Sequence, residues 1–151
     1  ILIYAGDERV ARMTTSIPHP LPPGASESFI ERAHATDRRE DVWVIDCSSS
    51  GGAELVGLIG MERLEGDTSE VGYWIAPAFW NTGIASEALA AIILANPQEV
   101  SVIVASVFQD NPASARVLTN CGFTYIGDAE SFSVARDATV RTWTYSLRLR
   151  E

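Results

Sequence analysis

The stretch "EVGYWIAPAFWNTGIASEAL", Glu70 to Leu89, changes from one kind of secondary structure to another. Its first part is β-branched, aromatic or small, which predicts a strand that ends at Pro77, because proline cannot donate to a strand ladder. The Ala, Leu and Ile residues that follow predict a helix from about Gly83 to Asn96. Such a helix would form without a glycine at its start. Gly83 therefore indicates a backbone shape, or a close approach to the backbone, that a side chain would block.

Length and composition fit one globular domain spanning residues 1–151. Of the 151 residues, 46% are hydrophobic and 21% charged, and no apolar run reaches the roughly 18 residues of a membrane span, so we expect no membrane partner. The two cysteines, Cys47 and Cys121, lie far apart without metal-ligand spacing. We therefore expect no metal site, and reduced thiols in a cytoplasmic location.

The net charge of -9 narrows the choice of partners. It opposes the attraction to phosphates that supplies most nucleic-acid affinity, so we expect no nucleic-acid partner. An acidic surface attracts cationic substrates by long-range steering. Many proteins are acidic for solubility alone, however, and that is the commoner reason.

Spacing and punctuation along the chain predict the remaining elements. Helical spacing or capping residues predict helices at residues 6–16, at 25–35 with Ser26 or Ser28 as the cap, and at 111–123. Alternating or β-branched segments predict strands at residues 42–47, 54–62, 70–77, 99–108, 124–134 and 139–149. Segment 99–108 is nearly all apolar and belongs at the centre of the sheet. One α+β domain on a mostly antiparallel sheet follows.

Two junctions lead from a strand into a helix, at Trp80–Ser86 and at Gln109–Ser114. A helix start has unpaired N–H groups and a partial positive charge, so it suits a phosphate. Two such ends side by side would form one cleft. The simpler readings are that Gly83 is only a tight turn and that Asn111 is only a helix cap, with Gly122 as the stop.

Together, the opening stretch and "VFQDNPASARVLTNCGF", Val107 to Phe123, resemble the GNAT superfamily of acetyl-CoA-dependent N-acetyltransferases. Within it they resemble the RimJ/RimL-like branch, which acetylates the N-termini of ribosomal proteins. That branch reads Gly-Tyr-Trp, then Trp-Gly-Lys-Gly-Tyr-Ala-x-Glu-Ala, then Asn-x-x-Ser and Gly-Phe. The resemblance extends from about Ile17 to the end of the chain, with "IPHPLPP" also typical of the branch.

The resemblance implies a GNAT-like α+β fold, with a mixed, mostly antiparallel central sheet of about six to seven strands flanked by about four helices. It also implies that the family's first strand is missing or shortened before Ile1. The strand that ends near Pro77 would splay from its neighbour, which leaves peptide groups free.

Acetyl-CoA is the co-substrate that the resemblance implies, and it assigns residues to each part of that molecule. Asn111 would donate or accept a hydrogen bond, and Ser114 would lie near the sulfur. The pantetheine arm would pair with the backbone of Trp74, Ile75 and Ala76 as an added strand does. The pyrophosphate would contact backbone amides of the loop formed by Trp80, Asn81, Thr82, Gly83, Ile84 and Ala85.

The sequence departs from the family pattern at three positions. Asn81 stands where Gly is usual, and Thr82 where Lys or Arg is frequent. Leu118 stands where many relatives have the tyrosine that protonates the departing thiolate. Ser114 is then the remaining candidate for that acid.

The reaction implied is direct transfer of the acetyl group from acetyl-CoA to a primary amine, either a protein N-terminal α-amine or a small-molecule amine. Glu70 and Glu62 are the carboxylates closest to the expected cleft and are candidates for the general base. Each could equally be a solvated strand-end residue. Tyr73 and Trp74 point to opposite faces of their strand, so one would line the acceptor channel while the other is core, and the sequence does not distinguish which.

Two alternatives stay open. The missing tyrosine and the missing basic residue are also compatible with a non-catalytic acyl-CoA-binding module. Apolar strand edges in the C-terminal hairpin could pair two copies of the chain, which would give a homodimer.

Overall fold

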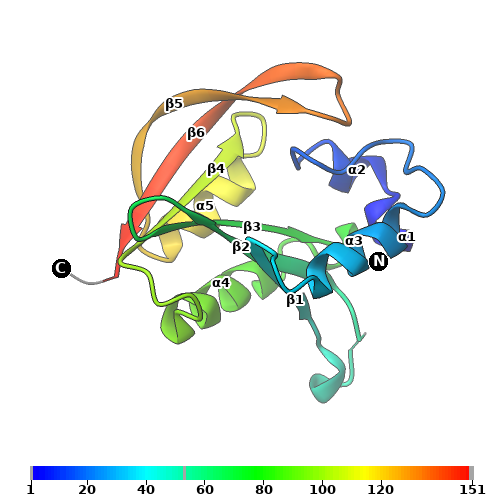
Figure 1. The fold of residues 1–151 in the computed structure, drawn as a ribbon, viewed down its shortest axis with the longest axis horizontal. Coiled ribbons are helices and arrows are strands. Elements are labelled where there is room, and N and C mark those ends of the chain that lie inside the picture. The colour runs from blue at the N-terminus through cyan, green and yellow to red at the C-terminus, as the bar shows by residue number, and fades with distance from the viewer. Residues whose placement is uncertain (1, 53, 150–151) are drawn as a thin grey trace.

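The computed structural model describes residues 2–52 and 54–149 and contains one six-stranded sheet (Figure 1). The strands lie in the order β1-β2-β3-β4-β6-β5. All neighbours pair antiparallel except β3 and β4, which run parallel. The expected mixed α+β sheet is confirmed, with β4 in its interior. The strands are β1 Glu40–Ile45, β2 Gly57–Leu64, β3 Thr68–Ile75, β4 Val102–Phe108, β5 Thr124–Ser133 and β6 Ala138–Arg148.

Helices cover both faces of this sheet (Figure 1). The α-helices are α1 Leu2–Ala5, α2 Glu8–Ala11, α3 Ala25–His34, α4 Ile84–Ala95 and α5 Pro112–Asn120, and two single 3-10 turns are η1 Ser48–Ser50 and η2 Pro77–Phe79. Within residues 2–52 and 54–149, no helix has both the length and the apolar character needed to cross a membrane.

The main core lies between the sheet and the pair α4 and α5. Leu89 of α4 and Leu118 of α5 are both fully buried against it. Burial of a leucine side chain contributes roughly 1.5–3 kcal/mol, which is why leucine is favoured here over a polar side chain. Leu118, at the position of the family's tyrosine, is therefore a core residue.

The N-terminal part of the chain differs from expectation in two places. The helix expected at residues 6–16 is wrong, because α2 is capped by Asp7 and ends at Ala11. Beyond it, Thr14 makes a tight turn back to the carbonyl of Ala11, and threonine loses rotamer freedom in a helix. The cap expected at Ser26 or Ser28 is also wrong. Gly24, with φ 79°, precedes α3, and no side chain caps that helix.

The expected cap and stop residues of α5 are confirmed. The side chain of Asn111 accepts a hydrogen bond from the backbone N–H of Ser114 at 3.4 Å, which satisfies one free donor of the first turn. Gly122 has φ 94° and ends the segment in the left-handed region that glycine adopts without strain. These local signals fix the side chains of the second junction relative to β4.

Candidate active site

Strands β3 and β4 separate part of the way along their length. Their pairing covers only Thr68–Glu70 with Val102–Val104, although β3 continues to Ile75 and β4 to Phe108. Past this point the two facing backbone edges do not pair with each other. An extended molecule can add to such an edge through main-chain hydrogen bonds. The separation agrees with the splayed strand that the family resemblance implies.

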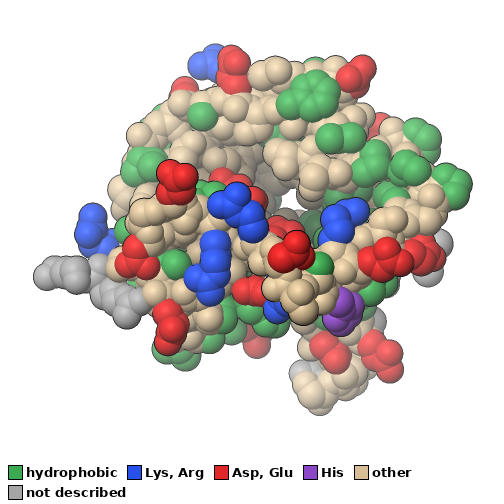
Figure 2. All heavy atoms as spheres, viewed as in Figure 1, with side chains coloured by type: hydrophobic (Ala, Val, Ile, Leu, Met, Phe, Trp, Pro, Cys, Tyr) green, Lys and Arg blue, Asp and Glu red, His purple; other side chains and the backbone are tan. Residues whose placement is uncertain are grey.

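A cavity of about 510 Å³ opens at this separation. Its floor is formed by residues 71–74 of β3 and 105–108 of β4, and its roof by residues 13–18 and part of α3. Figure 2 shows a hollow on this face with charged side chains at its rim. The volume lies within the range of roughly 300–1,000 Å³ that is usual for small-molecule sites.

The sheet register places the side chains of β1, β2 and β3 in three rows on the cavity face. Residues directly opposite on paired strands have Cβ atoms about 4.5–5.5 Å apart. The first row is acidic, the second is nearly flat because it contains two glycines, and the third is apolar. The rows are Glu40–Glu62–Glu70, Val42–Gly60–Gly72 and Val44–Leu58–Trp74.

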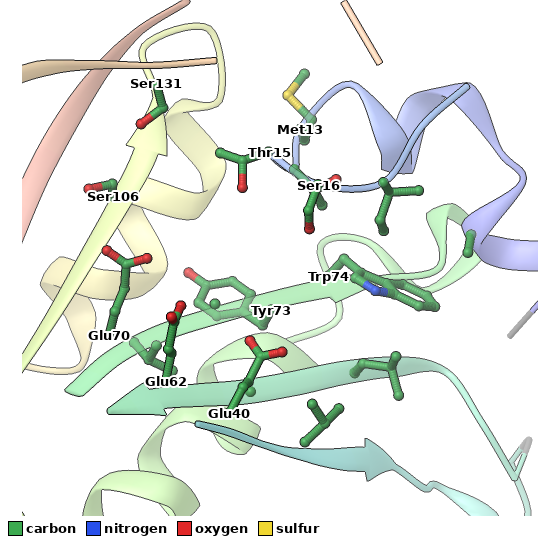
Figure 3. Close-up of a pocket in the computed structure, with 18 of the residues that line it drawn as sticks. Met13, Thr15, Ser16, Glu40, Glu62, Glu70, Tyr73, Trp74, Ser106 and Ser131 are labelled. Carbon is green, nitrogen blue, oxygen red and sulfur yellow. The ribbon is translucent and has the colours of Figure 1, made fainter. Parts of the chain in front are cut away.

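The acidic row faces into the cavity. Figure 3 shows the three carboxylates side by side on neighbouring strands and directed toward the residues of the roof. Burial, reinforced by Glu62, raises the pKa of Glu70 above its usual value. Burial also raises the pKa of Glu40, with the neighbouring carboxylates adding to the effect and Arg32 opposing it. A carboxyl group with a raised pKa is a better general base at neutral pH.

Ser114 and Asn111 also line this cavity, so the structure brings them together with Glu70 and Glu62. Tyr73 lines it as well, and its hydroxyl donates a hydrogen bond to the backbone carbonyl of Ser114 at 3.2 Å. Burial raises the pKa of Tyr73 to about 12. The hydroxyl therefore keeps its proton at neutral pH and can act as a donor beside Ser114.

Tyr73 and Trp74 both line the cavity (Figure 3). They leave β3 on opposite faces, and both can do so because the separation of β3 from β4 opens the sheet between its two faces. Tyr73 also packs against the main core, as expected for one of the two residues, and reaches the cavity with its hydroxyl end. Ile75 and Ala76, which follow, have buried side chains. The carbonyl of Ile75 accepts from the indole of Trp80, and Ala76 donates to the carbonyl of Val56 and accepts from the N–H of Phe79.

The loop before α4 has the backbone shape that the family's glycines would give it. Gly83 has φ 82°, and a Cβ placed on it would meet nothing within 4 Å. Asn81 has φ 60°. Asparagine is one of the few residues other than glycine that adopt this region readily, so Asn81 preserves the loop shape where the family has Gly.

Contacts within the loop hold it in place and leave the start of α4 open. The indole N–H of Trp80 donates to the carbonyl of Ile75 at 2.7 Å, and the Thr82 hydroxyl donates to the carbonyl of Phe79. Gly83 makes no side-chain cap for α4. The first N–H groups of α4, from Ile84 and Ala85 onward, are thus free to bind an anion.

The two junctions differ in their relation to the 510 Å³ cavity. Asn111 and Ser114 line the 510 Å³ cavity, whereas Asn81–Ala85 are not among its lining residues. The backbone of Trp74–Ala76 connects them, since Trp74 lines the cavity and η2 leads from Ala76 to the loop. A cleft shared by the two helix ends stays a prediction, with the end of β3 as the segment that joins them.

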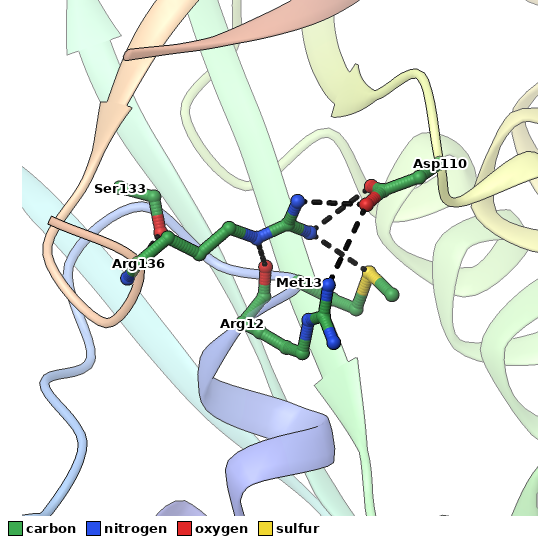
Figure 4. Close-up of polar contacts among 5 residues, drawn as sticks. All are labelled: Arg12, Met13, Asp110, Ser133 and Arg136. Atoms are coloured by element: carbon green, nitrogen blue, oxygen red, sulfur yellow. Dashed lines mark hydrogen bonds and ion pairs between the residues drawn. The ribbon is translucent and has the colours of Figure 1, made fainter. Parts of the chain in front are cut away.

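The sequence did not predict the positions of two residues near the site. Glu40 joins the acidic row only because β1 pairs with β2 in the register that sets it opposite Glu62, and no sequence signal fixed that register. Asp110, in the turn after β4, is the second. It pairs with Arg136 from the turn after β5 and contacts Arg12 (Figure 4).

This cluster of Asp110, Arg136 and Arg12 joins three distant segments of the chain at one end of the cavity. The Arg136 side chain also donates to the backbone carbonyl of Arg12 and lies over the ring of Phe108 at 4.9 Å. It therefore fastens the N-terminal roof segment and the β5–β6 turn to the end of β4. Among residues 2–52 and 54–149, no group of His, Cys, Asp or Glu is arranged to hold a metal ion.

Comparison with known proteins gives matches to acetyltransferases. The chain is 34% identical over 98 residues to the uncharacterized N-acetyltransferase YoaA of Bacillus subtilis (strain 168), which covers 62% of this chain and 55% of that protein. It is 35% identical over 89 residues to the ribosomal-protein-serine acetyltransferase of Escherichia coli (strain K12), covering 56% of this chain and 50% of that protein. The chain thus matches about half the length of these curated relatives.

The fold is similar to the crystal structure of the microcin C7 self immunity acetyltransferase MccE in complex with acetyl-CoA and AMP. The TM-score is 0.77 at 17% identity, over 98% of this chain and 88% of that one. The Escherichia coli relative agrees with the resemblance to the RimJ/RimL-like branch. The family model described as "Acetyltransferase (GNAT) domain" matches residues 1–124, and the chain belongs to the GNAT family of acetyltransferases.

Proposed function

We propose that the protein transfers the acetyl group of acetyl-CoA to a primary amine, either a protein N-terminal α-amine or a small-molecule amine. The observation that carries this proposal is the separation of β3 and β4 past Glu70 and Val104, beside a cavity that contains Ser114. Family membership and the acetyl-CoA bound to the similar fold of MccE support acetyl-CoA as the donor.

In this proposal acetyl-CoA occupies both sites. Its pyrophosphate binds the free N–H groups at the start of α4, and its pantetheine arm pairs with the backbone of Trp74–Ala76. The thioester then enters the cavity near Ser114. No side chain blocks the approach at Gly83, since a Cβ there would meet nothing within 4 Å.

The chemical step is attack of the amine nitrogen on the thioester carbonyl. A C–N bond forms, the C–S bond breaks, and the ammonium proton passes to a base. Glu70 or Glu62 is that base, directly or through a water molecule, and the raised pKa of Glu70 favours it. The thiolate takes a proton from the hydroxyl of Ser114 or from that of Tyr73, which donates to the backbone carbonyl of Ser114. Most of the rate comes from holding amine and thioester together, which can supply roughly 7–11 kcal/mol.

The first test is calorimetric titration with acetyl-CoA, with CoA titrated in parallel. We expect binding of both in the micromolar range, because the pyrophosphate and pantetheine contacts are common to the two molecules. A screen of primary amines, read by release of the CoA thiol, then tests turnover. Absence of acetyl-CoA binding would falsify the proposal.

The second candidate is a non-catalytic acyl-CoA-binding module. It is favoured by Leu118, which is buried in the core where relatives have a tyrosine, and by Thr82 in place of a basic residue. Micromolar binding of acetyl-CoA with no thiol release for any amine of the screen selects this function over the enzyme.

The surface that we propose for a homodimer is the outer edge of β5, in the C-terminal hairpin. Phe132 and Ile126 are about half exposed on this edge strand, at 54% and 59%, and edge strands with apolar side chains tend to pair with other chains. Light scattering over a range of protein concentrations tests it, with Ile126→Lys as the variant. A dimeric mass that this variant leaves unchanged excludes the β5 edge.

A further inference from the structure

The acidic row Glu40–Glu62–Glu70 has no partner of opposite charge bonded to it. Among the described residues, none of the three carboxylates takes part in an ion pair or accepts a hydrogen bond. Arg32 is the cation whose charge acts on Glu40. Like charges directly opposite on paired strands destabilise a sheet. Three of them facing one cavity make a site that a positive ligand would stabilise.

A second, independent feature of the cavity indicates a polar ligand. The hydroxyls of Ser26 and Thr142 are buried and have no hydrogen-bond partner in the described part of the chain. The two residues are 9% and 2% exposed, and both line the same cavity. A buried hydroxyl without a partner costs roughly 1–3 kcal/mol. A molecule with hydrogen-bonding groups in the cavity would remove that cost.

The glycine row gives such a molecule room beside the carboxylates. A Cβ placed on Gly72 would meet nothing within 4 Å, so the cavity is open directly above it. A Cβ on Gly60 would lie 3.1 Å from a carboxylate oxygen of Glu40. The Glu40 carboxylate therefore leans over the middle row. Gly72 lies two residues along β3 from Glu70, roughly 7 Å at 3.3–3.4 Å per residue.

We propose that the acidic row binds a second, cationic group of the acceptor, so that the protein acetylates small amines that carry two positive charges in preference to monoamines. This inference rests on the proposed acetyltransferase function. The reacting amine lies above Gly72, beside the separation of β3 and β4, and loses its proton before attack. The distal group keeps its charge and binds between Glu40 and Glu62, which leaves Glu70 as the base. Leu58 and Trp74 line the cavity on the other side of the glycine row.

The test compares the four-carbon diamine with n-butylamine, which differ only in the second amine. Steady-state kcat/KM is measured by thiol release at fixed ionic strength, with the wild type, Glu40→Gln and Glu65→Gln. Glu40 is the row member farthest from β4 and has no part in the proposed chemistry. Glu65 lies exposed in the turn after β2 and is the matched control.

We expect the wild type to prefer the diamine by about tenfold or more, as expected for a charge pair in a partly buried site. Glu40→Gln should reduce kcat/KM for the diamine by a severalfold larger factor than for n-butylamine, so that the preference between the two amines falls, and Glu65→Gln should leave that preference at its wild-type value. Equal kcat/KM for the two amines overturns the inference and leaves the acetyltransferase function standing. An equal loss for both amines in Glu40→Gln overturns it too, because that change would then act on the fold.

A binding measurement separates this inference from the proposed function. Calorimetric titration of the diamine into the protein saturated with CoA needs no turnover. Diamine binding that Glu40→Gln weakens supports the acidic subsite even where no amine is acetylated, in which case the catalytic proposal fails alone. No diamine binding by the wild type overturns the inference, whether or not n-butylamine is acetylated.

Discussion

Arg136, in the turn between β5 and β6, donates two hydrogen bonds to the carboxylate of Asp110, at 2.7 and 3.0 Å. The two residues are 26 positions apart in sequence, and they pair at the point where β4 passes into α5. The Arg136 side chain is only 15% exposed. Its bonds are therefore less screened by water than those of a surface pair.

Arg136→Gln should reduce the free energy of unfolding by about 1–2 kcal/mol, because it removes two charge-assisted hydrogen bonds and the contact with Phe108. Arg141→Gln is the matched control. The Arg141–Asp128 pair spans 3.6 Å with side chains 69% and 45% exposed, so its loss should cost less than about 0.5 kcal/mol. Urea unfolding measures both changes in the free energy of unfolding, and equal losses in the two variants would contradict a larger stabilisation by Arg136.

Gly83→Ala should weaken acetyl-CoA binding by about tenfold or more, because a methyl group enters the space where N–H groups of α4 would meet the pyrophosphate. The change also strains the backbone, since φ is 82° at this residue. Gly24→Ala controls for strain alone. It adds the same group at φ 79° before α3, also in open space.

We expect Gly24→Ala to lower stability about as much as Gly83→Ala and to leave the dissociation constant for acetyl-CoA unchanged. Asn81→Gly should keep wild-type affinity, because both residues adopt a positive φ readily. Calorimetry on the three variants provides the comparison. If Gly83→Ala binds acetyl-CoA with wild-type affinity, the loop before α4 is not part of the acetyl-CoA site.

Ser114→Ala should reduce kcat by about 10²-fold or more, the lower end of general acid catalysis, with little change in acetyl-CoA affinity. Tyr73→Phe tests the second hydroxyl, which donates to the carbonyl of Ser114. If the thiolate takes its proton from one of them, that variant loses turnover and the other retains it. Wild-type kcat in both variants would exclude both hydroxyls as the acid.

Glu40→Gln should raise the free energy of unfolding at pH 7 by about 0.2–1 kcal/mol, because it removes one of three neighbouring like charges. The pKa of Glu40 is raised in the folded protein from its ordinary value of 4.5. The folded state thus binds more protons than the unfolded chain just above pH 4.5, so stability falls as the pH rises through that window. The gain from the substitution should shrink as the pH is lowered toward 4.5.

Denaturant unfolding of the wild type, Glu40→Gln and Glu65→Gln at pH 7 and near pH 4.5 makes this comparison. Glu65 is exposed and belongs to no such row, so its substitution should alter stability little at either pH. A destabilised Glu40→Gln protein at pH 7 would contradict the repulsion between carboxylates of the row.

The sequence was sufficient where the structure depends on neighbours in the chain. Pro112 and Gly122 set the start and stop of α5, and Asn111 its cap, because capping acts over a few residues. The long apolar segment around β4 predicted an interior strand for the same kind of local reason. Glu62 and Glu70 could be named from their places in two strands that follow each other.

Features that depend on distant pairing could not be predicted in this way. Glu40 belongs to the acidic row through the register of β1, and a shift of one residue would turn it to the other face. The partner of Asp110 comes from a turn after β5. The spacing of charged and apolar residues after Gly6 predicted a helix of about eleven residues, of which only Glu8–Ala11 is helical. An isolated helix of that length has little stability unless it packs along its whole length.

The opening between β3 and β4 also links ligand binding to thermal stability. The edges of β3 and β4 do not pair with each other past Glu70 and Val104, inside a sheet that is otherwise continuous. A molecule that pairs with these edges binds the folded chain and not the unfolded one. Mass action then adds RT ln(1 + [L]/Kd) to the free energy of unfolding, about 2.7 kcal/mol at a ligand concentration one hundred times Kd. The melting temperature should therefore rise with the logarithm of ligand concentration.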